Sequence, residues 1–282
     1  MKSDNGRRKR RGAEMGVNEG NKWRVRILLV SVLMALFMIA GLSTAPSGQA
    51  GELTVAAASD LSFAFKELIP TFEQQTGEHV KFTLGSSGNF FSQIQNGAPF
   101  DLYFSADIGY PKKLEEASLT VPGSLYQYAV GRIVMWTGHE SHIDVTLGFE
   151  ALREPTVKKI AIANPKHAPY GRAAVAAMEY FKVYDQVKDK LILGENISQA
   201  AQFIESGACD IGIIALSLAV APIMKSKGTY WEVPAEAHPA LEQGAVILKS
   251  SKQQASAKQF LAFIKGAQGQ EIMKRYGFTL PN

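Results

Sequence analysis

The sequence predicts an α/β protein built on mainly parallel strands, and two observations lead to this fold class. Short apolar runs alternate with amphipathic segments through most of the chain after residue 50, which is typical of strands joined by helices that cover the faces of a sheet. The 232 residues of this region are also enough for one large hydrophobic core or two modest ones. The region shows no internal repeat and no low-complexity segment.

The first half of the region shows the alternation clearly. Leu53–Ala58 is a continuous apolar run of strand length, and apolar residues then recur from Leu61 to Phe72 along one helix face. We expect this helix to stop before Gly77. By the same criteria, strands are predicted at 53–58, 80–84 and 102–104, and a second helix is predicted between the turns at 85–88 and 97–99.

The second half repeats the same alternation of short strands and helices. Strands are predicted at 131–136, 159–163, 191–193, 211–215 and 244–248, and helices at 172–183, 198–206 and around 257–264. The last residues, Tyr276-Gly277-Phe278, are expected to form a terminal tail that packs back onto the body.

The first 50 residues have the composition of an export signal. Two basic clusters precede the apolar run Ile27–Leu42, and small residues follow it up to Ala50, so we expect a signal peptide over 1–50 that is cleaved after Ala50. The apolar run has 16 residues, fewer than the roughly 20 of a spanning helix, which makes an uncleaved anchor the weaker alternative. The only cysteine, Cys209, lies far from the cleavage region. We therefore expect a protein of the periplasm or extracytoplasmic space.

Charge and motif content exclude several classes of function. The leader holds nine Lys and Arg residues and three Asp and Glu residues, which leaves 21 basic and 23 acidic side chains in the mature part. The pI near 9.0 therefore belongs to the leader, and no nucleic-acid-binding face is expected. The five histidines show no metal-ligand spacing. Ser59 lacks the Gly-x-Ser-x-Gly elbow of a hydrolase serine, so an enzyme is not expected.

Four strand-to-helix turns indicate a site for a small anion. They are Ser59-Asp60, Ser86-Ser87-Gly88, Pro169-Tyr170-Gly171 and Asn196-Ile197-Ser198. Such turns lie at the carboxyl ends of parallel strands, where ligands bind, and each helix start has unpaired N–H groups and about half a positive charge. A small oxyanion can be held there without Lys or Arg, and the hydroxyls of Ser59 and Ser87 add neutral donors. Taken singly, each turn also fits an ordinary helix N-cap.

At these residues the chain resembles the periplasmic molybdate-binding proteins of ABC importers. The resemblance extends from Glu52 to Pro281. It is carried by Ala-Ala-Ala-Ser-Asp-Leu at 56–61, Gly-Ser-Ser-Gly at 85–88, Gln-Ile-Gln-Asn-Gly-Ala-Pro at 93–99, Ser-Ala-Asp at 105–107, Asn-Pro at 164–165, Ala-Pro-Tyr-Gly at 168–171 and Tyr-Gly-Phe at 276–278.

The resemblance implies a type II periplasmic binding fold, with two α/β domains that are joined by a two-strand hinge and close on the ligand. Each domain would be a mostly parallel sheet flanked by helices. We place domain I at 51–128 plus 243–282 and domain II at 129–242.

The resemblance also implies a set of ligand-binding residues. Ser59 and Ser87 would supply hydroxyl and backbone donors, and Asp60, Tyr170 and Ile197 would supply backbone N–H groups. Molybdenum would be bound only as the oxyanion, with no direct protein–metal bond and no cofactor. Some relatives have a tyrosine where this chain has Ile214-Ala215-Leu216, so that hydroxyl is missing here. The Asp60 carboxylate would repel a dianion, and we expect it to cap the following helix and face away from the ligand.

The function implied is capture of molybdate, and also tungstate, for delivery to an ABC permease and ATPase, by a protein expected to be monomeric. Two alternatives stay open. The ligand could be another tetrahedral oxyanion, sulfate or phosphate, and Asp60 keeps phosphate open because hydrogen phosphate needs a proton acceptor. The chain could also be an exported ligand-sensing domain rather than a transport component.

Overall fold

The fold is described from a computed structural model that covers residues 51–281 of the chain. The predicted signal peptide and its cleavage site lie outside the described residues. Within residues 51–281, no helix is both long and apolar enough to cross a membrane.

The first sheet has five strands in the order β2-β1-β3-β10-β4. The central strand pairs are parallel, β1 with β2 and β1 with β3, whereas β10 is antiparallel to both β3 and β4. The strands are β1 (Leu53–Ala58), β2 (Val80–Gly85), β3 (Leu102–Ser105), β4 (Tyr126–Gly131) and β10 (Leu241–Ile247).

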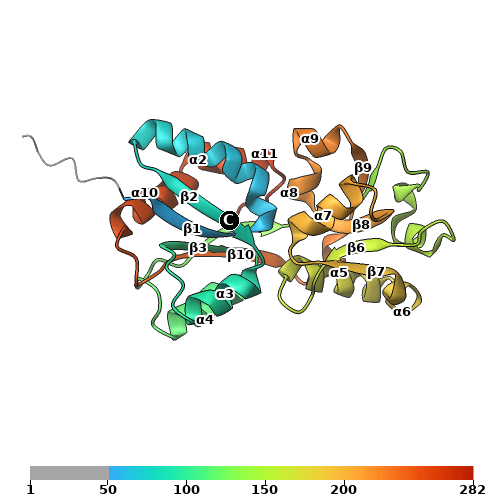
Figure 1. Cartoon of the computed structure of the whole chain (residues 1–282), viewed down its shortest axis with the longest axis horizontal. Helices are drawn as coiled ribbons and strands as arrows, with labels where there is room; N and C mark the ends of the chain where they lie inside the picture. The colour runs from blue at the N-terminus through green and yellow to red at the C-terminus, as the bar shows by residue number, and fades with distance from the viewer. Residues whose placement is uncertain (1–50, 282) are drawn as a thin grey trace, which may run out of the picture. The chain divides into compact units, whose positions relative to one another are not determined.

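Helices cover both faces of this sheet (Figure 1). On one side lie α2 (Ser62–Thr76), α10 (Gln254–Lys265) and α11 (Ala267–Arg275), and on the other α3 (Ser87–Gln95) and α4 (Gly109–Glu116). Phe65 of α2 packs edge-to-face against Phe104 of β3 and Phe260 of α10, with ring centroids 5.2 and 6.0 Å apart. This aromatic cluster fixes α2, and with it the turn between β1 and α2, against the sheet.

The second sheet also has five strands, in the order β7-β6-β8-β5-β9. Here β6 is parallel to β7 and β8, and β5 is antiparallel to β8 and β9. The strands are β5 (Ile133–Gly138), β6 (Ile160–Ala163), β7 (Leu191–Gly194), β8 (Ile211–Ala215) and β9 (Gly228–Glu232).

The helices of the second half again lie on both faces of their sheet (Figure 1). They are α7 (Ile197–Glu205), α8 (Leu216–Ala219) and α9 (Pro222–Lys225) on one side, and α5 (Pro169–Tyr180) and α6 (Tyr184–Val187) on the other. Four short 3-10 helices complete the described fold: η1 (Ser59–Leu61), η2 (Val145–Arg153), η3 (Lys188–Lys190) and η4 (Ala235–Ala237).

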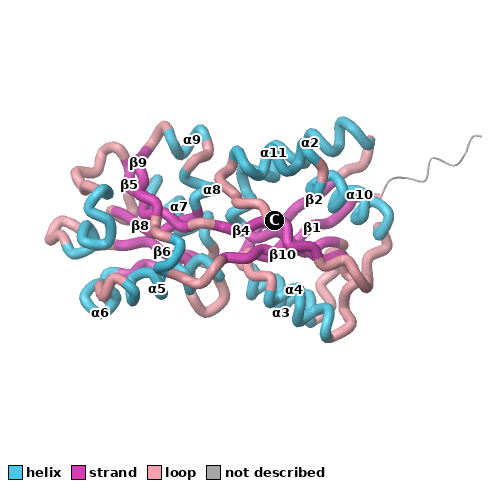
Figure 2. The backbone as a smooth tube through the Cα atoms, turned by 180° about the vertical axis from the view of Figure 1, so that it is seen from behind, coloured by secondary structure: helices cyan, strands magenta, loops and turns pink. Residues whose placement is uncertain are grey.

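The chain passes between the two sheets twice (Figure 2). It leaves the first sheet at Arg132, between β4 and β5, and returns over residues 233–240, between β9 and β10. The terminal tail packs back as expected, since Thr279 forms a bridge with Val130 of β4 and Phe278 is buried. Two mixed five-stranded α/β sheets joined by two crossings confirm the predicted fold class. The domain boundaries at 128 and 243 stay predictions.

Several predicted boundaries are wrong. The strand predicted at 244–248 is β10, which spans Leu241–Ile247. The strand predicted at 131–136 is the meeting point of two strands, because β4 ends at Gly131 and β5 begins at Ile133. The two belong to different sheets, which apolar residues on both sides of Arg132 do not reveal. The helix predicted from 172 begins at Pro169, because proline is well tolerated at the first helical position.

Candidate oxyanion site

The four predicted turns meet at one small cavity between the two sheets. Its volume is about 10 Å³, whereas pockets for organic ligands measure roughly 300–1,000 Å³. The cavity is lined by Ala58, Ser59, Asp60, Gly85, Ser86, Ser87, Ala106, Ala168, Pro169, Tyr170, Asn196 and Ile197. All five predicted ligand-binding residues are in this set, and the cavity is too small for an organic ligand.

The five residues come from both halves of the fold. Ser59 and Asp60 follow β1 and Ser87 follows β2, at the carboxyl ends of two parallel strands of the first sheet. Tyr170 and Ile197 follow β6 and β7, which are parallel neighbours in the second sheet. The site is therefore complete only when both sheets contribute.

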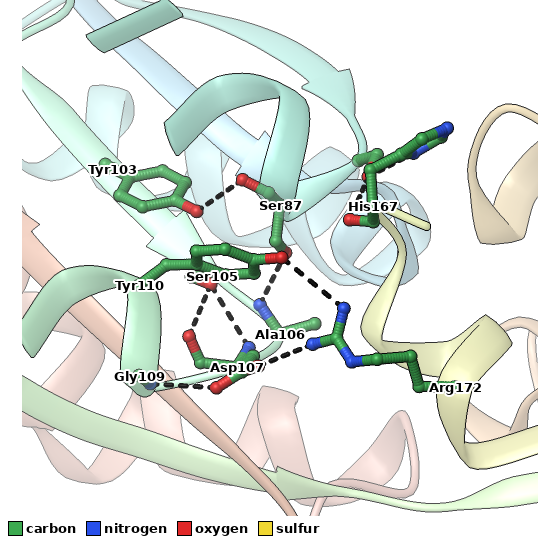
Figure 3. Close-up of polar contacts among 10 residues, drawn as sticks. Ser87, Tyr103, Ser105, Ala106, Asp107, Gly109, Tyr110, His167 and Arg172 are labelled. Carbon is green, nitrogen blue, oxygen red and sulfur yellow. Dashed lines mark hydrogen bonds and ion pairs between the residues drawn. The ribbon is translucent and has the colours of Figure 1, made fainter. Parts of the chain in front are cut away.

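The hydroxyl of Ser87 is held in place by its neighbours (Figure 3). Its Oγ accepts a hydrogen bond from the backbone N–H of Ala106 at 2.9 Å, and its carbonyl oxygen accepts one from the hydroxyl of Tyr103 at 2.7 Å. Because the Oγ acts as an acceptor in this contact, its own hydrogen is left to donate. Ser87 is 1% exposed, so this donor is presented in a buried position.

The hydroxyl of Ser59 is held in the same way, by Ser198 on the second-sheet side of the cavity. Its Oγ accepts the N–H of Ser198 at 3.2 Å, and its carbonyl oxygen accepts the Ser198 hydroxyl at 2.8 Å. These bonds join η1 to the first turn of α7 and again leave the hydroxyl hydrogen of Ser59 to donate.

Helix starts supply the backbone donors of the second sheet. Pro169 is the first residue of α5 and has no N–H, so Tyr170 carries the first backbone donor of that helix. In α7 the Asn196 side chain accepts the N–H of Gln199 at 3.1 Å. This cap does not use the N–H of Ile197, the first residue of the helix. Within residues 51–281, neither the Tyr170 nor the Ile197 N–H donates to another protein group.

The cavity contains one ionisable carboxylate and no cationic side chain among the described residues that line it. Asp60 is 1% exposed, and its Oδ2 accepts the Tyr170 hydroxyl at 2.9 Å and the Gln243 side-chain amide at 2.7 Å. Burial raises the pKa of Asp60 from 3.8 to about 6, against the opposing effect of the hydrogen bonds from Gln243 and Tyr170.

The expectation that Asp60 caps the following helix is wrong. α2 begins at Ser62 with Leu61 at its N-cap, and Asp60 lies inside η1. The intervening 3-10 turn moves Asp60 away from the capping position, so its side chain is buried against Tyr170 and Gln243 instead.

Several contacts close the site from the two sides. The hydroxyl of Ser217 in α8 donates to the carbonyl oxygen of Asp60 at 2.8 Å. The carbonyl oxygen of His167 accepts the N–H of Gly88 at 2.9 Å and the hydroxyl of Ser86 at 2.6 Å. These bonds join the first-sheet turns to the second-sheet turns directly, so the structure has a closed site.

An ion pair lies beside the site and was not predicted from the sequence (Figure 3). The guanidinium of Arg172 in α5 lies 2.6 Å from the Asp107 carboxylate and 3.4 Å from the Tyr110 hydroxyl. In the sequence, the segment 105–107 contributed only to the family resemblance. Arg172 was not predicted to lie at the site, because arginine is common on helix surfaces. In addition, no group of three or more His, Cys, Asp or Glu side chains suited to a metal ion occurs in residues 51–281.

Two α/β sheets joined by two crossings, with a small cavity between them, are the architecture of a solute-binding protein. Residues 53–279 match the model of a family described as bacterial extracellular solute-binding protein. The chain belongs to this family, and within it to the family of the molybdate-binding protein ModA. It is therefore a solute-binding protein that acts outside the cytoplasm and not an enzyme.

Similar proteins support this assignment over most of the chain. The molybdate-binding protein ModA of Rhodobacter capsulatus is 37% identical over 245 residues, which are 87% of this chain and 94% of that protein. The solved periplasmic molybdate-binding protein of Azotobacter vinelandii superposes with a TM-score of 0.78 at 34% identity, covering 82% of this chain and all of that one. The sulfate-binding protein SubI of Mycobacterium tuberculosis, with a TM-score of 0.65 at 16% identity over 82% of this chain and 87% of that one, shares the fold alone.

Proposed function

We propose that this protein captures molybdate, and also tungstate, in the periplasm and delivers it to the permease and ATPase of an ABC importer. The export signal over 1–50 is cleaved after Ala50, and the mature protein acts as a monomer. The names of the relatives from Rhodobacter capsulatus and Azotobacter vinelandii support the choice of ligand. The chemistry of the cavity independently supports an oxyanion as the ligand.

The observation that carries the proposal is a set of hydrogen-bond donors around the cavity that have no protein acceptor among the described residues. The hydroxyls of Ser59 and Ser87 both accept a backbone N–H and keep their own hydrogens to donate. The N–H groups of Tyr170 and Ile197 face no protein acceptor among the described residues. A fully deprotonated tetrahedral oxyanion offers acceptors only, so these donors match it, and helix N-termini supply positive potential without a counter-cation.

Size is the expected basis of selectivity between oxyanions. Molybdate, tungstate and sulfate are all tetrahedral dianions, but the two metal oxyanions are larger. Fixed backbone donors at four helix starts set the distance at which an oxygen is bound, and a smaller anion cannot reach all of them at once. We therefore expect molybdate and tungstate to bind more tightly than sulfate.

Calorimetric titration with molybdate, tungstate, sulfate and phosphate tests the proposal. We expect saturable binding of one molybdate or tungstate per chain and little or no heat with sulfate. Scattering profiles with and without molybdate should show a more compact bound state, because the site is assembled from both sheets. Tight sulfate binding without a molybdate signal would overturn the choice of ligand.

Phosphate is the second candidate, and the buried carboxylate of Asp60 is the observation that favours it. Hydrogen phosphate carries a proton that needs an acceptor, and Asp60 Oδ1 has no hydrogen-bond partner in the described structure. Phosphate binding should then collapse in an Asp60→Asn variant, whereas molybdate binding should persist. If the variant lost molybdate binding and kept phosphate binding, Asp60 could be neither the proton acceptor for phosphate nor dispensable for molybdate.

A further inference from the structure

Asp60 belongs to a buried polar cluster made of Asp60, Tyr128, Tyr170 and Gln243. Gln243 Nε2 donates to Asp60 Oδ2 at 2.7 Å and to the Tyr170 hydroxyl at 2.9 Å, and the Tyr128 hydroxyl donates to Gln243 Oε1 at 2.7 Å. All four side chains are at most 2% exposed. The cluster joins η1, β4 and β10 on the first-sheet side to α5 on the second-sheet side.

The donors of this cluster do not reach the second oxygen of the carboxylate. Both Gln243 amide hydrogens are used, and the single hydroxyl hydrogen of Tyr170 is donated to Asp60 Oδ2. Asp60 Oδ1 is buried and has no hydrogen-bond partner among the described residues. An ionised carboxylate with one oxygen left unsolvated is strongly disfavoured in a buried position.

No cation compensates the charge of Asp60 within residues 51–281. The titratable groups that face it are Tyr170 and Tyr128, and burial raises the pKa of both phenols well above their ordinary value, so they stay neutral. From α7 and α8, the side chains that reach η1 are the hydroxyls of Ser198 and Ser217.

Charged side chains on the elements around Asp60 are engaged elsewhere or exposed. They are Lys66, Glu67 and Glu73 on α2, Lys81 on β2, Arg172 and Glu179 on α5, Glu205 on α7 and Glu242 on β10. A dianion that enters the cavity therefore adds two negative charges beside an uncompensated carboxylate.

We propose that Asp60 is a proton-binding site that fills together with the oxyanion site. As the dianion enters and the site closes, Asp60 Oδ1 takes up one proton from solvent, and it returns that proton when the site opens and the anion leaves. This inference rests on the proposed oxyanion function. The second-sheet groups Tyr170 and Ser217 cover Asp60 in the closed structure. Opening therefore returns water to the carboxylate, which stabilises its ionised form, and the proton is released.

The sign and the pH window follow from the acidity of Asp60 in the two states. Its pKa is about 6 in the closed structure, against an ordinary value of 3.8, and a neighbouring dianion raises it further. The closed state thus binds more protons than the open state, so affinity is highest below the open-state pKa and falls as pH rises through the closed-state pKa. From these values, affinity at pH 5 should be at least about tenfold higher than at pH 8.

Calorimetric titration of the protein with molybdate in buffers of different ionisation enthalpy tests the proposal. At pH 6 we expect uptake of between about one half and one proton per anion bound. The Asp60→Asn variant resembles the protonated acid, so it should bind molybdate more tightly than the parent at pH 8 and show no proton uptake from this site. Asp185→Asn, which changes an exposed carboxylate, is the matched control and should keep the proton uptake of the parent.

A second measurement uses the unaltered protein. Infrared difference spectra recorded on adding molybdate should show a new C=O band of a protonated carboxylic acid that is absent from the Asp60→Asn variant. Molybdate binding with no proton uptake and no such band overturns the proton-binding role while leaving the oxyanion function intact. Absence of binding by every oxyanion in the titrations overturns the proposed function itself.

Discussion

The hydroxyl of Ser87 offers the sharpest test of the proposed anion-binding donors, because it has two separable roles. Its Oγ accepts the buried N–H of Ala106 at 2.9 Å, and its hydrogen is free to donate to the anion. Ser87→Ala removes both roles. Loss of a hydrogen bond to a charged partner amounts to about 1.5–3 kcal/mol, so we expect molybdate to bind about 10- to 150-fold more weakly.

The same substitution also affects the free energy of unfolding. It leaves the N–H of Ala106, which is 1% exposed, without its partner, and an unsatisfied buried donor destabilises by about 1–3 kcal/mol. Urea unfolding of the ligand-free protein measures this part separately from the affinity measured by calorimetry.

Two further variants complete this test. Ser92→Ala removes an exposed hydroxyl one turn later in α3, where it bonds only the Gly88 carbonyl oxygen, and should leave affinity unchanged. Ser87→Thr keeps a hydroxyl and should recover part of the lost affinity. A folded Ser87→Ala protein that binds molybdate within twofold of the parent would refute the assignment of this hydroxyl to the anion.

Three other predictions follow from the described geometry. Because the pKa of Asp60 is raised to about 6 in the closed structure, the closed, molybdate-bound protein loses stability as pH rises from about 4 through 6. Asp60→Asn should therefore stabilise the molybdate-bound protein at pH 8 by up to about 3 kcal/mol but not at pH 4; equal urea midpoints for both proteins in saturating molybdate at pH 8 would contradict this. Gly171→Ala should lower the melting temperature strongly, because its Cβ would lie 2.1 Å from the Ala163 carbonyl oxygen. Gly138→Ala should be tolerated, because its Cβ would meet nothing closer than 3.7 Å. Similar melting temperatures for the two variants would show that the turn at Gly171 can shift. Arg172→Ala removes a partly exposed ion pair and should weaken molybdate binding less than about fivefold, with a smaller effect at high salt; a loss above a hundredfold would indicate direct contact with the anion.

The sequence predicted which turns line the cavity, because the main components of each turn are local. A strand end, a Ser- or Gly-containing turn and a helix start all lie within a few residues, and parallel strands bring their carboxyl ends to one edge. Ser59, Ser87, Tyr170 and Ile197 therefore line one cavity as the pattern indicated. The strands at 53–58 and 211–215 were also predicted with the bounds that the structure has, because each is an isolated apolar run.

The parts that sequence reasoning missed depend on contacts between distant segments. Gln243 is a buried polar residue of β10, and its burial is explained by contacts with Asp60, 183 positions away, and with Tyr170 and Tyr128. The change of sheet at Arg132 was missed because apolar strands lie on both sides of it. The position of the Asp60 side chain was also wrong, since it depends on the 3-10 turn η1 that separates β1 from α2.

Ser59 shows why ligand binding and closure of the two sheets are expected to be one event. Its Oγ accepts the N–H of Ser198 from α7, and the same atom carries the hydrogen that is free for the anion. Withdrawing α7 would remove both this contact and the N–H of Ile197 from the site. A Ser59→Ala variant should therefore lose affinity and also show less compaction on adding molybdate. Ser92→Ala, which removes a hydroxyl bonded only within α3, should leave the compaction unchanged.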